Sequence, residues 1–169
     1  VRHIVGVQLR NLATVGGSLY SRFGFSDVLT LFLALNASVE LYKGGVVPLA
    51  EYAQRPYDRD ILVRVLVPKQ DAKFCYQSVR NSQTDIPVLT CAAAKSTAGE
   101  YRFAIGARPG KAVLYMMHAE AGETPELTAA RFAASVRGSI QTESNIRGSA
   151  EYRNHLAGVL VRRAVQQLG

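Results

Sequence analysis

The sequence predicts an α+β fold in which a small mixed unit is followed by an antiparallel sheet and two closing helices. Strand-like runs follow one another over short connections from residue 61 to residue 118, and short connections favour antiparallel pairing. Two helical patterns then close the chain, so strands and helices are segregated along the sequence. The length of 169 residues suits one globular domain or a compact pair of small ones.

The composition is that of an ordinary globular chain, with 48% hydrophobic and 20% charged residues. No run approaches the roughly 18 apolar residues of a membrane helix, and no signal-peptide pattern is present. The net charge is +7, but the basic residues are scattered. This favours a basic surface that meets an acidic partner subunit or an anionic cofactor over a nucleic-acid interface. Because the first residue is Val, we interpret the sequence as a piece of a longer chain.

The first element with a clear pattern is a helix over residues 26–36. Ser26 can cap its N-terminus, and Asp27 in the first turn interacts favourably with the helix dipole. The apolar residues that follow leave almost no polar face, so the helix is predicted to be buried.

A short strand pair follows this helix. Residues 37–42 alternate between polar and apolar side chains, which predicts a half-exposed strand. Residues 46–48 can form the returning strand, and residues 49–54 one or two helical turns. The polar, proline-containing run 54–60 is the expected boundary between two subdomains.

The second half is predicted to form the main sheet. Its expected strands lie in five runs: 61–68, 73–80, 87–95, 101–110 and 111–118. Thr124 caps the next helix, and Pro125 occupies the first helical position, where a missing N–H costs nothing. Gly148 and Ser149 open the last helix.

The cysteines and histidines do not indicate a metal centre. Two cysteines, Cys75 and Cys91, are too few for an iron–sulfur cluster, which takes about four thiolates, and we expect buried thiols in a reducing cytoplasm. His3, His118 and His155 lack the spacing of metal ligands.

The segment 13–27, ATVGGSLYSRFGFSD, carries the strongest functional pattern. Gly16 and Gly17 allow a ligand to approach the backbone, and the hydroxyls of Thr14 and Ser18 suit an anion. Asp27 can accept a hydrogen bond from a sugar or ring group. The segment is neither a P-loop nor a GxGxxG motif, and a device that lets the neighbouring helix pack closely is an alternative explanation of the glycine pair.

The stretch QLRNLATVGGSL resembles the RN-x-A-T/S-V/I-GG-N segment of one flavoprotein family. That family comprises the FAD domains of xanthine dehydrogenases, aldehyde oxidoreductases and carbon monoxide dehydrogenase flavoprotein subunits. The resemblance implies that the segment contacts the diphosphate and ribityl region of FAD, and that an Asp a few residues on contacts the cofactor. The matching positions are Thr14, Val15, Gly16, Gly17, Ser18 and Asp27.

The resemblance continues through ALNASVELYKGGVVPLAEY and from DILVRVLVP to GSAEYRNHLAGVLVRRAV. It implies that residues 1–57 are part of the second FAD-binding subdomain (PCMH-type), being the C-terminal half of the flavin domain. Residues 58–169 are then similar to the C-terminal domain of the CO dehydrogenase flavoprotein. The N-terminal FAD subdomain, which supplies another Gly-rich loop for the pyrophosphate, is missing from this sequence.

Some positions depart from the family pattern. Ser18 replaces Asn or Asp, and Ser78 stands where a Lys near the flavin is frequent. The run 22–25, RFGF, replaces a small Pro-containing stretch, and its two aromatics could pack on the flavin or on the core. Three residues lie in a loop that can border the flavin in relatives: Arg80, Gln83 and Asp85.

The resemblance implies an oxidoreductase component, the FAD subunit of a xanthine dehydrogenase-type complex in the cytoplasm. FAD would pass electrons from iron–sulfur centres to an acceptor such as NAD⁺, with no catalytic side chain and no metal on this chain. Molybdopterin and 2Fe-2S centres would lie on partner subunits. The alternative is a non-redox module that docks subunits and does not bind flavin alone. A nucleic-acid-binding domain is disfavoured because the arginines are dispersed.

Overall fold

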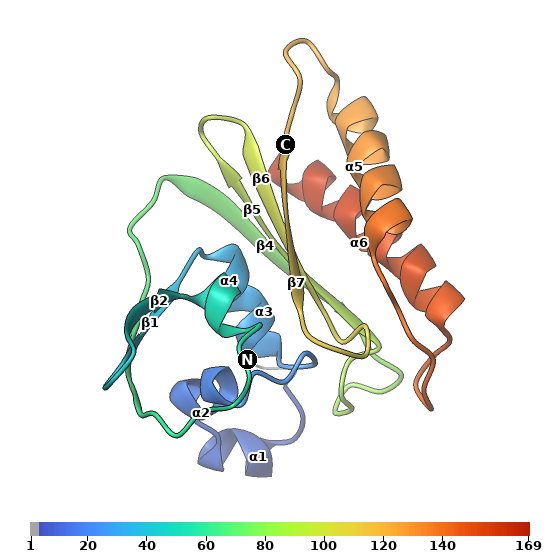
Figure 1. Ribbon diagram of the computed structural model, residues 1–169. Helices are drawn as coiled ribbons and strands as arrows, with labels where there is room; N and C mark the ends of the chain where they lie inside the picture. Colours follow the sequence, from blue (N-terminus) through green and yellow to red (C-terminus); the bar gives the residue numbers. More distant parts are fainter. Residues whose placement is uncertain (1–3) are drawn as a thin grey trace.

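The computed structural model describes residues 4–169, so that His3 lies outside the described part. The helices are α1 (Val7–Leu12), α2 (Val15–Tyr20), α3 (Asp27–Ala34), α4 (Leu49–Tyr52), α5 (Pro125–Ser139) and α6 (Ala150–Leu168). The strands are β1 (Ser38–Leu41), β2 (Gly45–Pro48), β3 (Leu62–Leu66), β4 (Ala72–Val79), β5 (Leu89–Ser96), β6 (Glu100–Gly106) and β7 (Val113–His118). They form an antiparallel sheet in the order β2-β1-β3 and another in the order β4-β5-β6-β7 (Figure 1). The predicted α+β class is confirmed.

The capping residues predicted for α3 and α5 are confirmed, and α6 starts where the sequence indicated. The Ser26 hydroxyl accepts a hydrogen bond from the N–H of Leu29 at 3.2 Å, at the start of α3. Thr124 caps α5 with Pro125 in its first turn, and Ser149 caps α6. Each cap satisfies an N–H that has no acceptor inside its own helix.

The strand β3 belongs to the first sheet. We expected the run 61–68 to begin the main sheet, and this was wrong, because β3 pairs antiparallel with β1. The Asp60 carboxylate supplies a reason, since it accepts hydrogen bonds from the N–H groups of Lys43 and Gly44 at 3.0 and 2.8 Å. These bonds fix the start of β3 beside the turn that ends β1. The domain boundary expected after residue 57 stays a prediction.

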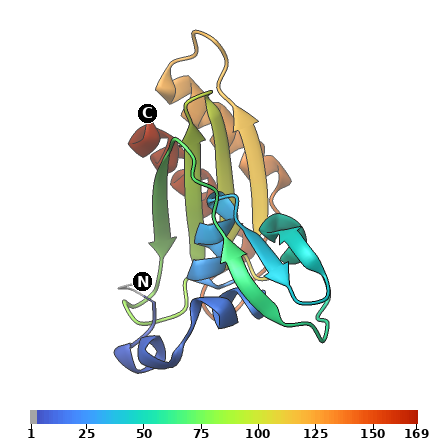
Figure 2. The same cartoon turned by 90° about the vertical axis from the view of Figure 1, so that its left-hand side faces the viewer.

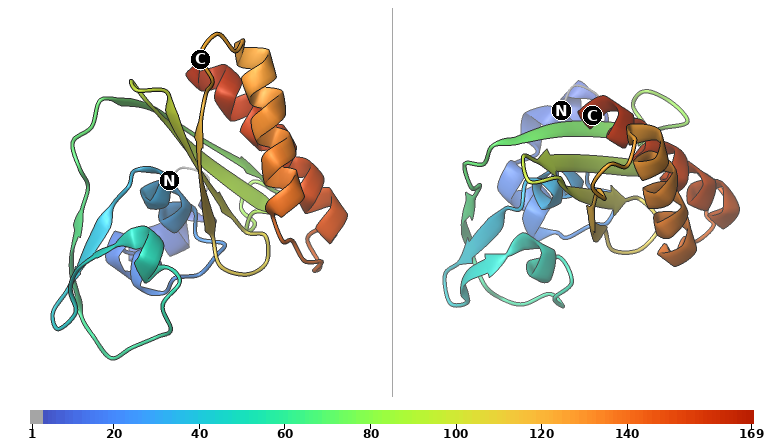
Figure 3. Two further views of the ribbon diagram at one scale, coloured as in Figure 1. Left: turned by 45° about the horizontal axis from the view of Figure 1, so that its top comes forward. Right: turned by 90° about the horizontal axis from the view of Figure 1, so that it is seen from above.

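The four-stranded sheet separates two hydrophobic cores. Successive side chains of a strand point to opposite faces, so Cys91 and Ala93 of β5 face the core under α5 and α6. Ala92 between them faces the other core, which α3 and the three-stranded sheet complete. Figures 1 and 3 show α5 and α6 covering one face of the sheet, with α3 and the small sheet on the other. The near-total burial of β5 follows from this arrangement.

The short helices α1 and α2 were not predicted. They lie at the same end of the molecule as the loop between β4 and β5 (Figure 2). None of the described helices has the length and hydropathy that crossing a membrane requires. Residues 4–169 also contain no group of three or more His, Cys, Asp or Glu side chains placed to hold a metal ion.

Candidate functional site

The Gly-Gly pair lies in the first turn of α2. Thr14 is the N-cap residue, and its Oγ1 accepts a hydrogen bond from the N–H of Gly17 at 2.9 Å. The Ser18 hydroxyl donates to the Thr14 carbonyl oxygen, also at 2.9 Å. The N–H groups of Val15 and Gly16 precede the first intrahelical bonds, so the helix itself offers them no acceptor. The turn therefore presents N–H donors that have no acceptor within the helix, next to a side-chain hydroxyl.

Neither glycine of the pair serves close packing of helices. A Cβ built on Gly16 meets no atom within 4 Å. A Cβ on Gly17 meets only Oγ1 of Thr14, at 3.0 Å. No atom of α3 approaches either position, so the packing explanation of the pair is wrong.

Asp27 lies at the first position of α3 with its side chain 8% exposed. Its Oδ1 accepts hydrogen bonds from the Tyr76 hydroxyl and from Nη2 of Arg80, whose side chain is 7% exposed. Burial and the neighbouring Asp27 carboxylate raise the pKa of Tyr76, so its phenol stays neutral and donates. No described residue donates a hydrogen bond to Oδ2 of Asp27.

Arg80 is fixed at two of its three nitrogens. Nη1 donates to the carbonyl oxygen of Asp85 at 2.7 Å, and Nη2 is paired with Asp27. Nε is buried without a hydrogen-bond partner among the described residues. A buried N–H without an acceptor is energetically costly.

Three adjoining hollows connect the start of α2 to Asp27. Thr14, Val15 and Ser18 line the first, which has a volume of about 170 Å³. Ser18 and Asp27 both line the second, of about 180 Å³. Asp27 also lines the third hollow, whose volume is about 310 Å³. Tyr76 and Ser78 of β4 and Arg80 of the following loop line this hollow as well. We call these connected hollows the α2–α3 groove.

The groove brings together four of the predicted cofactor residues. Thr14, Val15, Ser18 and Asp27 line it, while Gly16 and Gly17 occupy the same turn of α2 without lining it. Of the loop residues considered from the sequence, Arg80 lies in the groove and Gln83 is exposed to solvent. Asp85 forms an ion pair with Arg147 at 2.9 Å.

The two aromatic residues of the RFGF run lie on the rim of the groove, whereas Arg22 is buried against the ring of Tyr52. Phe23 and Phe25 are 50% and 43% exposed, and their rings stack at a centroid distance of 5.2 Å. Gly24 between them lies so close to the turn after β6 that a Cβ would meet the Gly110 carbonyl oxygen at 1.7 Å. The Gly24 carbonyl oxygen accepts a hydrogen bond from Ala107 at 2.6 Å. This contact holds the two rings at the surface, so packing on the core is excluded.

The sequence interpretation missed Tyr76. The alternation along β4 places Tyr76 and Ser78 on the same face of the strand, and Arg80 follows at the same spacing. That pattern identifies a shared face, but it does not indicate that the face meets Asp27 at the start of α3.

The chain matches two protein families along almost its whole length. Residues 1–70 match the FAD binding domain in molybdopterin dehydrogenase, and residues 74–168 match the CO dehydrogenase flavoprotein C-terminal domain. The chain belongs to the family of the CO dehydrogenase flavoprotein, because the model of that family's C-terminal domain matches more than half of its residues. The resemblance drawn from the sequence is thereby confirmed.

Relatives of this flavoprotein come from several bacteria. It is 30% identical over 183 residues to the nicotine 6-hydroxylase medium subunit of Paenarthrobacter nicotinovorans, covering 99% of this chain and 65% of that protein. It is 27% identical over 153 residues to YgfM of Escherichia coli K12, covering 90% of this chain and 57% of that protein.

Among solved structures, a carbon monoxide dehydrogenase from Hydrogenophaga pseudoflava, in a form that lacks the Mo-pyranopterin moiety, has the same fold. The TM-score is 0.81 at 23% identity, over 99% of this chain and 64% of that one. The flavoprotein chain thus spans between 57% and 65% of the length of these relatives.

Proposed function

We propose that this chain is the C-terminal part of the FAD-carrying subunit of a multi-subunit, molybdopterin-dependent hydroxylase of the xanthine dehydrogenase type. FAD would accept electrons from iron–sulfur centres on a partner subunit and pass them to an acceptor such as NAD⁺. The observation that carries the proposal is the α2–α3 groove, because residues from the family's FAD segment and Asp27 line neighbouring hollows that share lining residues.

The α2 end of the groove suits a diphosphate. The Thr14 hydroxyl uses its oxygen to cap α2 and keeps its proton for a second partner, such as a phosphate oxygen. The N–H groups of Val15 and Gly16 are further donors, and the open space beside Gly16 admits a ligand to the backbone. We assign this turn, Thr14 to Ser18, to the diphosphate and ribityl region.

The Asp27 end of the groove suits hydroxyl groups and a ring edge. Oδ2 of Asp27 can accept from a ribityl hydroxyl while Oδ1 stays engaged with Tyr76 and Arg80. These donors and acceptors fit FAD, which supplies the redox chemistry when bound, whereas the protein binds and orients it. We propose no catalytic side chain on this chain.

The remainder of the FAD site is proposed to lie on the part of the subunit that the relatives have and this sequence lacks. That part would carry a second Gly-rich loop for the pyrophosphate. Residues 1–57 would then be the partial second FAD-binding subdomain, and residues 58–169 the CO dehydrogenase flavoprotein C-terminal-like domain. Subunits that carry 2Fe-2S centres and molybdopterin would complete a cytoplasmic enzyme.

A flavin titration tests this proposal. We expect the 169-residue chain to bind FAD weakly, and the full-length gene product that contains it to bind one FAD tightly. Quenching of flavin fluorescence measures both affinities. Tight stoichiometric binding by the chain alone would show that the site is complete without further residues. Absence of binding by the full-length product would refute the proposal.

A further inference from the structure

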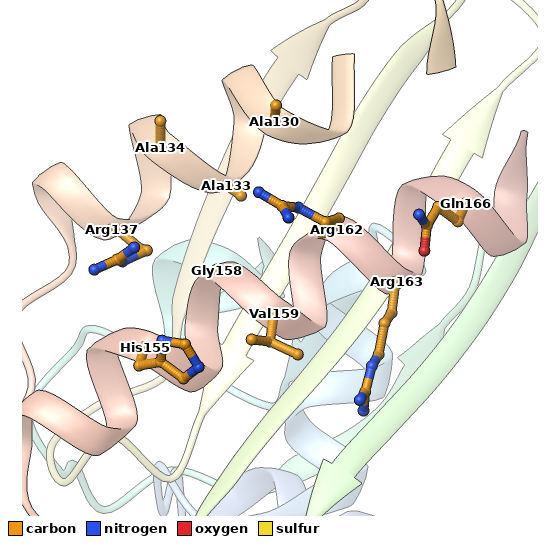
Figure 4. Close-up of a pocket in the computed structure, with 10 residues that line it drawn as sticks. All are labelled: Ala130, Ala133, Ala134, Arg137, His155, Gly158, Val159, Arg162, Arg163 and Gln166. Atoms are coloured by element: carbon orange, nitrogen blue, oxygen red, sulfur yellow. The ribbon is translucent and has the colours of Figure 1, made fainter. Parts of the chain in front are cut away.

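A second depression lies between α5 and α6, on the side of these helices that faces away from the sheet (Figure 4). Its volume is about 500 Å³. Small residues of both helices form much of it, with Ala133 on α5 and Gly158 on α6. A partner can therefore come close to the two helix backbones. We call this depression the α5–α6 groove.

The α5–α6 groove is basic and lacks acidic residues. Four of its ten lining residues carry basic side chains: Arg137, His155, Arg162 and Arg163. None of the three arginines forms an ion pair with a described residue. In contrast, Arg131 on the same helix as Arg137 is held by Glu123 at 2.7 Å. The groove thus holds three arginines whose charges are not neutralised by any described carboxylate, and no acidic residue lines it.

The structure holds Arg137 in position across the groove. A Cβ on Gly158 would lie 2.5 Å from Cδ of Arg137, so the absence of a side chain there leaves room for the arginine stem. Nε of Arg137 donates to Oδ1 of Asn154 at 3.2 Å, and the Asn154 amide donates back to the Arg137 carbonyl oxygen at 2.8 Å. Neither terminal nitrogen of Arg137 has a hydrogen-bond partner among residues 4–169. An arginine fixed in this way loses less conformational entropy on binding a carboxylate.

We propose that the α5–α6 groove binds an acidic α-helix of a partner protein. His155 and Arg162 lie seven positions apart on α6, which corresponds to about 10.5 Å along the helix. A partner helix with Glu at i, i+3 or i+4, and i+7 presents carboxylates over the same length. Arg137 on α5 and Arg162 on α6 then engage these carboxylates from the two sides, and guanidinium groups pair well with carboxylates.

The lining residues favour a protein helix over a nucleic acid. No aromatic side chain that could stack on a base lines the groove, apart from the imidazole of His155. The groove lies across the sheet from α3 and shares no lining residue with the α2–α3 groove. The inference is therefore independent of the proposed flavin site and can fail separately.

Two helical peptides of identical composition test the inference. Each is alanine-rich, fluorescein-labelled and about 20 residues long, so that it is helical in isolation. One carries its Glu residues on a single face, and the other carries them distributed around the helix. We expect the full 169-residue chain to bind the single-face peptide more tightly, by fluorescence anisotropy, and added salt to weaken that binding.

Matched variants assign the binding to the groove. Arg137→Gln and Arg162→Gln should each weaken it about tenfold, because a charge-assisted hydrogen bond is lost. Arg59→Gln removes the same charge from an exposed loop and should leave the affinity unchanged. Circular dichroism confirms that each variant is folded.

Several outcomes would overturn the inference. Equal affinity for the two peptides, or an equal loss with Arg59→Gln, would show attraction by net charge alone. Undetectable binding of both peptides would exclude an acidic helix as the occupant. Tighter binding of a single-stranded oligonucleotide of the same charge would assign the groove to nucleic acid.

Discussion

Replacement of Gly16 by alanine separates a cofactor role of this glycine from a structural role. An added Cβ meets no atom within 4 Å, so Gly16→Ala introduces no clash in the unliganded protein. Alanine also restricts the unfolded chain and favours the helix, which stabilises a protein by about 0.5–1 kcal/mol. We therefore expect the melting temperature of the 169-residue chain to rise by about 1–4 °C. In the full-length gene product, however, the methyl group would occupy the approach of the FAD diphosphate, and flavin affinity should fall.

Gly138→Ala is the matched control for this substitution. Gly138 lies in α5, where an added Cβ also meets nothing within 4 Å, and it is remote from the α2–α3 groove. Gly138→Ala should raise the melting temperature by a similar amount, and the full-length protein should keep its flavin. Urea unfolding and the flavin content of the purified proteins measure the two effects. A fall in the stability of the Gly16→Ala chain, or flavin retained as in Gly138→Ala, would refute the assigned role. Gly17→Val is a less direct test, because its Cβ would also disturb the Thr14 cap.

Three further predictions concern buried and paired groups. Asp27→Asn leaves the buried Arg80 without its counter-charge and should lower the free energy of unfolding, measured with urea, by about 3 kcal/mol. A decrease below about 0.5 kcal/mol would contradict this. The hydrogen bond from Arg131 lowers the pKa of Glu123 from 4.5 to about 2, so its stabilising effect is complete above pH 4.5 and is lost as pH falls toward 2. The free energy of unfolding should therefore be higher for the wild type than for Glu123→Gln above pH 4.5, and the two values should converge near pH 2; a difference that is constant with pH would argue against this role of Glu123. Cys91 is 1% exposed and burial raises its thiol pKa, so a thiol reagent should label it only on unfolding; fast labelling of the folded chain would contradict its burial.

Local sequence chemistry was sufficient to predict the capped helices and most strands. Ser26, Thr124 and Ser149 each precede an apolar helical pattern, and each caps the helix that was expected. The resemblance to a flavoprotein family is confirmed by the match of residues 1–70 to the family's FAD binding domain, whereas FAD contacts of the segment 13–27 stay a prediction. These features depend on residues close together in the sequence or on long colinear similarity.

Non-local pairing could not be predicted in the same way. The strand β3 looks like the first strand of the main sheet, and only its hydrogen bonds to β1 show otherwise. Tyr76 and Arg80 meet Asp27 across about fifty positions of sequence, through the packing of α3 on the four-stranded sheet. The helices α1 and α2 are six residues each and include a Gly-Gly pair, so helix propensity does not indicate them.

The flavin content of the full-length gene product that contains this chain tests the proposed function most directly. The protein should be purified without added cofactor and its bound flavin released and identified. We predict one FAD per chain, with the visible absorbance of a flavoprotein. A colourless product that takes up no FAD on reconstitution, while remaining folded by circular dichroism, would contradict the assignment of the α2–α3 groove to the cofactor.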